Sequence, residues 1–188
     1  MRILSLLTLL LWASMGLGAP PPVTETAGKK AAEESDGHAA VISISERSAA
    51  ENFKLSDLKG NPHRLSDYKG KVVVISFWAT WCKPCLRELT FLKSLKAQHP
   101  GKLEILAIAT DGPNTASRIR PTVKRKKLTM PVLLDSDGSV MASMNSRGIL
   151  PQSNYIDKQG KLAYAHTGFV SGDEEIIEKA ILKLLGEK

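Results

Sequence analysis

The only two cysteines of this 188-residue chain, Cys82 and Cys85, are three residues apart. They follow an apolar run from Lys71 to Trp78 and stand where a helix-like segment begins. A thiolate at a helix N-terminus faces unpaired backbone N–H groups and the positive end of the helix dipole, so its pKa can fall from about 8.5 to roughly 3.5–7.5. The second cysteine, one turn later, can close or reopen a disulfide with the first. The spacing therefore predicts a redox-active pair.

Zinc is the main alternative for a Cys-x-x-Cys sequence. A structural zinc site needs four Cys or His ligands, and the chain has no second cysteine pair. We therefore expect no metal here and no bound cofactor. Two unreactive core thiols are a further alternative, but Trp81 before Cys82 and Pro84 before Cys85 fit redox chemistry better.

Glu88 lies three residues after Cys85 and six after Cys82, on or near the same face of the predicted helix. A carboxylate there could relay protons to the pair. The alternative is an exposed acid in the first turn, favoured by the helix dipole. Lys83 adds a positive charge beside Cys82 or is simply solvated, and Pro84 shapes the first turn, where its missing N–H is tolerated.

Two buried strands and the helix between them must position these residues. The runs Lys71 to Trp78 and Leu103 to Ala109 lack polar alternation, which is typical of strands covered on both faces. Between them, residues 82–99 carry leucines at helical spacing and end at a Pro-Gly stop. A right-handed βαβ unit is therefore predicted.

The rest of the domain reads as shorter strands and a final helix. Residues 132–134 form a strand, a short segment follows near 140–144, and residues 154–156 and 162–166 form an antiparallel hairpin because their connection is short. The last helix is amphipathic, with Ser171 or Asp173 near its cap.

Three regions follow from composition. Residues 1–19 have a short positive start, an apolar stretch and small residues, which indicates a secretory signal peptide; an uncleaved membrane anchor is the alternative. Residues 20–50 hold few large apolar side chains and are predicted to be a flexible linker, in which residues 41–44 could dock as an edge strand. Residues 51–188 have the size of one domain.

The run KVVVISFWATWCKPC, from Lys71 to Cys85, resembles the strand and active-site loop of the thioredoxin superfamily. The preceding FKLSDLKG (residues 53–60) and LSDYKG (65–70) resemble the lead-in of its exported TlpA/ResA-like branch. The resemblance covers roughly residues 51–188. It implies an α/β, thioredoxin-like three-layer sandwich, with a central mixed β-sheet flanked by helices, and an enzyme of thiol-disulfide exchange.

Chemistry and the resemblance agree on the cysteines: Cys82 is the expected nucleophile, since it is nearer the helix start, and Cys85 the resolving thiol. TlpA/ResA-like proteins often carry a glutamate at the position of Glu88, where it is linked to thiol reactivity. Thioredoxins have a buried Asp six residues before the first cysteine, where this chain has Ser76. The absence of that acid favours Glu88 as the proton acceptor.

Pro151 occupies the place of the cis-proline that faces the active-site disulfide in the superfamily. Composition alone favours trans, because only about 5–6% of X-Pro bonds in folded proteins are cis. Position favours cis, and the competing Pro131 matches an earlier element. Client segments are expected to bind here by strand addition, beside Leu150, Trp81 and Pro84.

The resemblance also implies partners and location. It favours a monomeric reductant of specific protein disulfides, as in cytochrome c maturation or copper-site assembly, recharged by a membrane thiol donor of the DsbD or CcdA type. The protein is expected to be exported, to a bacterial periplasm. A Sco-like copper protein using His166 would have three residues between its cysteines, and a peroxiredoxin would have a Pro-x-x-x-Thr-x-x-Cys site; both are weaker alternatives.

The net charge of +7 is concentrated in residues 118–127, which hold six Lys and Arg side chains. Such a run could meet an anionic membrane or acidic clients, although it is more often a solvated helix face. Nucleic-acid binding is not expected, because the run has no aromatic residues and the protein is expected to be exported.

Overall fold

The strand that leads to the cysteine pair lies inside a seven-stranded sheet of order β2-β1-β5-β4-β3-β6-β7 in the computed structural model, which describes residues 41–188. All seven residues of β3 (Val72–Trp78) are buried. β4 (Leu103–Ala109) runs parallel to β3, and α1 (Lys83–Gln98) connects them. The predicted βαβ unit is confirmed.

The remaining strands extend the sheet on both sides. β5 (Val132–Leu134) runs parallel to β4, and the β1–β2 hairpin (Lys54–Asp57, Pro62–Arg64) is antiparallel to it at one edge. On the other side β6 (Gln152–Ile156) runs antiparallel to β3 and pairs with β7 (Leu162–Thr167). The sheet is therefore mixed, as expected, and the predicted hairpin is confirmed.

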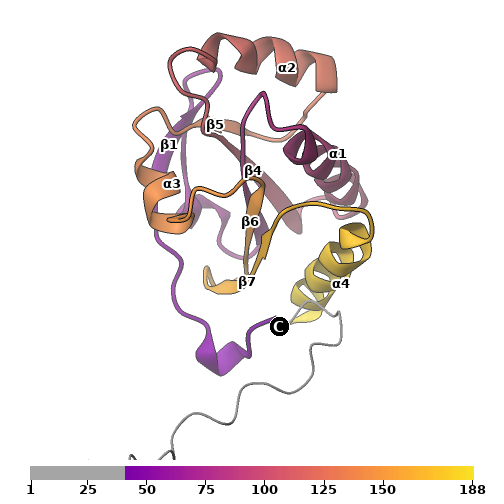
Figure 1. The fold of residues 1–188 in the computed structure, drawn as a ribbon. Helices are drawn as coiled ribbons and strands as arrows, with labels where there is room; N and C mark the ends of the chain where they lie inside the picture. Colours follow the sequence, from indigo (N-terminus) through magenta and orange to yellow (C-terminus); the bar gives the residue numbers. More distant parts are fainter. Residues whose placement is uncertain (1–40) are drawn as a thin grey trace, which may run out of the picture. The chain divides into compact units, whose positions relative to one another are not determined.

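Helices cover both faces of the sheet (Figure 1). On one face, α1, α2 (Ile119–Lys126) and α4 (Asp173–Gly186) contribute to an apolar cluster around Val72, Val74 and Trp78. On the other, η2 (Leu65–Tyr68) and α3 (Ser139–Met144) cover Val73, Ile75 and Phe77. Because successive side chains of a strand point to opposite faces, β3 supplies both cores. The result is the three-layer α/β fold.

The folded part of the chain begins earlier than the predicted boundary at residue 51. Ile42 N–H donates to Ala163 O at 2.7 Å, and Ala49 forms a bridge with Lys161 beside β7. Residues 44–46 form a short 3₁₀ helix, η1, so the predicted edge strand is replaced by a bridge and single hydrogen bonds. The predicted signal peptide, and the linker up to residue 40, lie outside the described residues.

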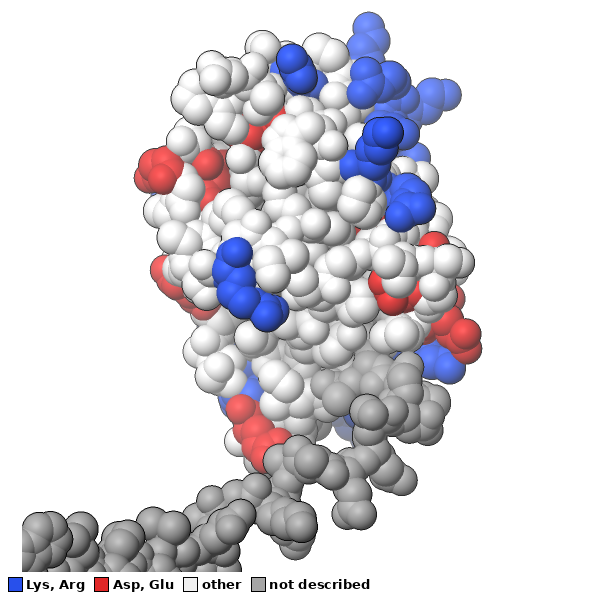
Figure 2. All heavy atoms as spheres, in the orientation of Figure 1, with Lys and Arg blue, Asp and Glu red and all other residues white. Residues whose placement is uncertain are grey.

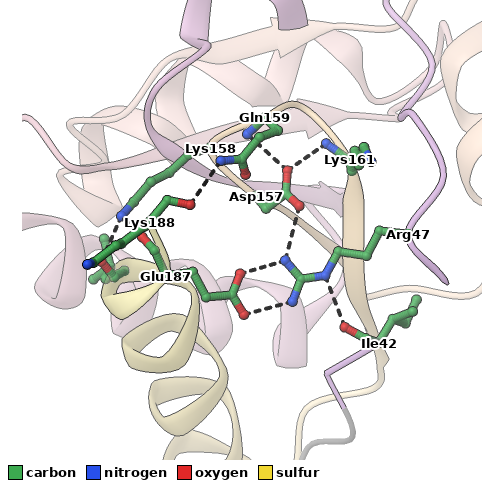
Figure 3. Close-up of polar contacts among 9 residues, drawn as sticks. Ile42, Arg47, Asp157, Lys158, Gln159, Lys161, Glu187 and Lys188 are labelled. Atoms are coloured by element: carbon green, nitrogen blue, oxygen red, sulfur yellow. Dashed lines mark hydrogen bonds and ion pairs between the residues drawn. The ribbon is translucent and has the colours of Figure 1, made fainter. Parts of the chain in front are cut away.

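A buried arginine fastens this N-terminal segment (Figure 3). The Arg47 side chain is 1% exposed and contacts Asp157 at 3.0 Å and both carboxylate oxygens of Glu187 at 2.6 and 2.8 Å. Its Nε also donates to Ile42 O at 3.0 Å. One side chain thus joins the segment before β1, the β6–β7 turn and the end of α4.

The helix α4 begins between the two residues, Ser171 and Asp173, that were expected near its cap. Gly172 is the N-cap residue, with φ 102°, a backbone region that suits glycine. Asp173 is the first helical residue, and its carboxylate accepts a hydrogen bond from Val170 N–H at 2.7 Å. In residues 41–188, no helix combines the length and apolar character that crossing a bilayer requires.

Candidate active site

Cys82 and Cys85 form a disulfide at the start of α1, with Cα atoms 5.3 Å apart. Cys82 is the N-cap residue, and its Sγ accepts a hydrogen bond from Cys85 N–H at 3.3 Å. The predicted placement at a helix N-terminus is confirmed, and Pro84 lies in the first turn. Cys82 retains 5% exposure and Cys85 none, while the neighbouring Trp81 is 62% exposed. Incoming groups therefore meet Cys82 before Cys85.

An aspartate that the sequence analysis did not identify holds the loop before Cys82. Asp111 accepts hydrogen bonds from Thr80 N–H at 2.9 Å and from Thr80 Oγ1 at 2.6 Å. Asp111 follows β4 and Thr80 follows β3, and the carboxyl ends of these parallel strands meet at one edge of the sheet. The sequence did contain a signal for this contact: Thr80 and Asp111 are polar residues that each follow a buried strand, and the two strands are neighbours in the sheet.

Glu88 is fully buried on α1, so the exposed-acid alternative is wrong. Its Oε2 accepts a hydrogen bond from Ser76 Oγ at 2.9 Å, and its Oε1 accepts one from Ser153 Oγ at 2.8 Å. Ser76, at the position of the thioredoxin aspartate, is therefore a partner of this carboxyl. Ser153 was missed because it is 65 residues away in sequence.

Burial raises the pKa of Glu88 to about 7, because removal from water disfavours the charged carboxylate more than the two serine hydroxyls favour it. The Asp173 carboxylate raises the pKa further by like-charge repulsion. Cys85 and Glu88 are three residues apart on one buried helix face, which makes their side chains neighbours. A carboxyl that titrates near neutrality thus lies beside the buried thiol position.

The Leu150–Pro151 peptide is cis, as predicted, and it is the only cis bond within residues 41–188. Pro151 is buried, and its carbonyl accepts a hydrogen bond from Gly168 N–H at 2.8 Å. The next residue, Gln152, pairs with Phe77 near the end of β3. Pro151 therefore lies at the sheet end where β3 leads into the cysteine loop.

Three exposed apolar side chains belong to loops at this same end of the sheet. Trp81, Ile149 and Val170 are 62%, 40% and 64% exposed and follow β3, precede β6 and follow β7, respectively. Leu150 is half-buried between both cores. Trp81 and Leu150 were predicted from the sequence, but Ile149 and Val170 were not, because single apolar residues in loops carry no periodic signal.

Comparisons with known proteins agree with this geometry. Residues 47–165 match the AhpC/TSA family. The thiol-disulfide oxidoreductase ResA of Geobacillus kaustophilus is 38% identical over 128 residues, which cover 68% of this chain and 72% of ResA. The thioredoxin-like protein YneN of Bacillus subtilis is 32% identical, covering 71% of this chain and 78% of YneN.

Among solved structures, the pneumococcal exposed lipoprotein thioredoxin Etrx1 of Streptococcus pneumoniae is similar, with a TM-score of 0.60 and 31% identity. The match covers 71% of this chain and all of Etrx1. The chain belongs to the AhpC/TSA family of thioredoxin-fold proteins, in its ResA-like branch. It is a thiol-disulfide oxidoreductase with a Cys-x-x-Cys pair.

The two alternatives are less supported. The relatives are named for thiol-disulfide exchange, and the two cysteines form the disulfide that such exchange uses. His166, the ligand that a Sco-like site would need, has its Nε2 3.2 Å from Asp173 Oδ2. This nitrogen is buried without a hydrogen-bond partner within residues 41–188, and the group beside it is a carboxylate on α4.

Proposed function

We propose that the protein, in its dithiol form, reduces disulfides of particular protein clients outside the cytoplasm. The observation that carries this proposal is the arrangement of Cys82, which retains slight exposure, the fully buried Cys85 and the buried Glu88 carboxyl with a pKa of about 7. These are the nucleophile, the resolving group and the proton acceptor that one exchange cycle needs. The resemblance to the TlpA/ResA-like branch implies that electrons flow from the protein to the client.

In the first step, the Cys82 thiolate attacks a client disulfide, forms a mixed disulfide and releases one client thiolate. In the second, Cys85 gives its proton to Glu88, and its thiolate attacks Cys82 Sγ. The Cys82–Cys85 bond forms, the bond to the client breaks, and the second client sulfur leaves as a thiolate that takes up a proton. Two electrons have moved to the client.

The client segment binds at the sheet end formed by Trp81, Ile149, Val170 and the Leu150–Pro151 peptide. Exposed apolar side chains around a reactive sulfur can cover the segment that carries the client disulfide. Backbone next to β6 can add the client as an extended strand. Pro84 and Trp81 border the cysteines directly.

Export and recharging belong to the same proposal. A signal segment in residues 1–19 would deliver a soluble monomer to a bacterial periplasm, where a membrane thiol donor of the DsbD or CcdA class returns the disulfide to the dithiol. N-terminal sequencing of the exported protein checks the cleavage. A chain that still begins with Met1 would favour the membrane anchor instead.

Trapping tests the function. Cys85→Ser should accumulate mixed disulfides through Cys82, because the resolving thiol is gone; these are detected as adducts that dithiothreitol releases. Cys82→Ser is the matched control and should capture no client. A reduction potential near that of thioredoxin, about −270 mV, is expected, whereas a value near that of DsbA, about −120 mV, would contradict a reducing role.

A further inference from the structure

Glu88 has no direct contact with solvent. Its side chain is buried, and both carboxylate oxygens accept hydrogen bonds from Ser76 and Ser153, which are themselves 0% exposed. Cys85 can take the proton back when the disulfide is reduced again, but a carboxyl whose charge follows the pH must also exchange protons with water. The structure therefore has to offer a route between this carboxyl and water.

A second polar cluster begins on the strand next to Ser153. In the β6–β7 ladder, Ser153 pairs with His166 and Tyr155 pairs with Tyr164. Residues directly opposite each other on antiparallel strands, and residues two apart on one strand, share a face of the sheet. His166 and Tyr164 therefore lie on the face that carries Glu88.

His166 is held between two partners at the edge of this cluster. Its Nε2 lies 3.2 Å from Asp173 Oδ2, and its Nδ1 lies 3.0 Å from the Tyr164 hydroxyl. The side chains of His166 and Asp173 are each 14% exposed, but His166 Nε2 itself is buried and has no hydrogen-bond partner within residues 41–188, so the cluster reaches solvent through Asp173. Imidazole can accept a proton at one nitrogen and release one from the other.

The groups between Glu88 and His166 are close enough to influence one another. Asp173 raises the pKa of Glu88, and burial together with Glu88, Tyr164 and Asp173 raises the pKa of Tyr155. The Tyr155 hydroxyl is buried and has no hydrogen-bond partner among residues 41–188, so it can both donate and accept. Tyr155 and Tyr164 are in contact, with ring centroids 5.1 Å apart.

We propose that His166, held by Asp173 and Tyr164, is the positioning residue that passes protons between buried Glu88 and solvent. The proposal rests on the proposed role of Glu88 as proton acceptor of Cys85. Only a proton moves: the neutral Glu88 carboxyl gives it to the unpartnered Tyr155 hydroxyl, the Tyr164 hydroxyl passes one to Nδ1 of the imidazole, and Nε2 passes one to the Asp173 carboxylate, which releases it to water. The charge on the imidazolium is balanced by the Asp173 carboxylate while the proton is in transit.

The test is the pH profile of the exchange rate in the full chain. His166→Gln should lower the exchange rate with hydroxyethyl disulfide, a small neutral substrate, by about tenfold near pH 7. This loss is smaller than the roughly 10²–10⁴-fold rate effect of a group that acts directly as general acid or base. Added imidazole buffer should restore the rate in proportion to its concentration. Asp173→Asn should also lower the rate, which covers the case in which His166→Gln does not fold.

The chain offers a matched control at the far edge of the sheet. His63 on β2 also lies between a carboxylate and a tyrosine, with its Nε2 3.4 Å from Asp57 Oδ2 and its Nδ1 hydrogen-bonded to the Tyr68 hydroxyl. His63→Gln should leave the pH profile unchanged.

The outcomes separate this proposal from the proposed function. A wild-type profile for folded His166→Gln, or a loss that imidazole does not restore, overturns the role of His166. If Glu88→Gln lowers the exchange rate while His166→Gln does not, only the proposed proton path through His166 is wrong. If Glu88→Gln has no effect, the proton-acceptor role within the proposed function fails, and the route fails with it.

Discussion

The acidity of Glu88 follows from where its carboxyl group lies. Burial disfavours the carboxylate, and hydrogen bonds from Ser76 and Ser153 compensate only in part. The serine hydroxyls can donate to a carboxylate or accept from a carboxylic acid, so both protonation states find partners. A proton acceptor next to a thiol works best when its pKa is near the working pH.

The same burial makes stability depend on pH. The pKa of Glu88 is about 7 in the folded protein and 4.5 when unperturbed, so the folded state binds the proton more tightly. Its contribution to stability is fully present below about pH 4.5 and is lost as pH rises through 7, a difference of about 3 kcal/mol. Glu88→Gln removes this dependence. The measurement is the free energy of unfolding in urea of the oxidised wild type and variant at pH 5 and pH 8. An equal change in this free energy between the two pH values for both proteins would contradict the raised pKa of Glu88.

At the scale of elements, the loop between β3 and α1 depends on an anchor from β4. Asp111 receives two hydrogen bonds from Thr80, just ahead of the cysteines. Asp111→Ala should cost about 1–3 kcal/mol, because it leaves the Thr80 N–H and hydroxyl without their partner. It should also slow exchange at Cys82, since the loop loses its fixed position. Thermal unfolding and stopped-flow exchange measure both effects.

Asp137→Ala is the control for the loop experiment. Asp137 is an exposed residue that accepts a hydrogen bond from Ser139 N–H at 3.0 Å, away from the cysteine loop. Its removal should leave the exchange rate unchanged. An equally slow Asp137→Ala would show that the loss in Asp111→Ala reflects general destabilisation.

The N-terminal segment depends on Arg47. Arg47→Met removes the cation that pairs with the buried Asp157 and the partly buried Glu187. Loss of one partner of a buried ion pair lowers the free energy of unfolding by roughly 3–5 kcal/mol. We expect about 3 kcal/mol, because Glu187 is 17% exposed and can be partly solvated. Urea unfolding is the measurement, and Arg118→Met, at an exposed arginine, is the control. A variant as stable as wild type would show that the contacts in Figure 3 contribute little.

Sequence predicted the elements whose residues are uniformly apolar or regularly spaced. β3, β4 and α1 are of this kind, and all are buried or amphipathic. The β1–β2 hairpin was not predicted as strands, because its residues are half-buried or exposed at a sheet edge. Arg47 was assigned to a linker because its partners lie 110 and 140 residues away.

The site was predictable only where its residues are close in sequence. The cysteine pair is such a local pattern, whereas the contacts of Glu88 to Ser153 and of Thr80 to Asp111 depend on strand register.

For the whole molecule, the sheet separates two functions. Cys82 follows the carboxyl end of β3, whereas Asp157, which binds Arg47, follows β6 at the other end of the antiparallel pair. In Figure 1 the segment from residue 41 accordingly lies at the end of the domain opposite α2. The N-terminal attachment therefore leaves the redox end of the sheet free to meet clients.

The salt dependence of the exchange rate tests whether the basic side chains of residues 118–127 attract acidic clients. The six Lys and Arg side chains of residues 118–127 are exposed, and Figure 2 shows Lys and Arg gathered on the visible face toward α2. Exchange with an acidic peptide disulfide should therefore exceed that with a neutral one by about tenfold at low salt, and the difference should shrink near 0.5 M salt as screening shortens the range of attraction. Lys124→Glu with Lys126→Glu should abolish the difference, whereas Lys183→Glu, at an exposed position late in α4, should preserve it. Equal rates for the two peptides at low salt would mean that this basic surface is only solvated.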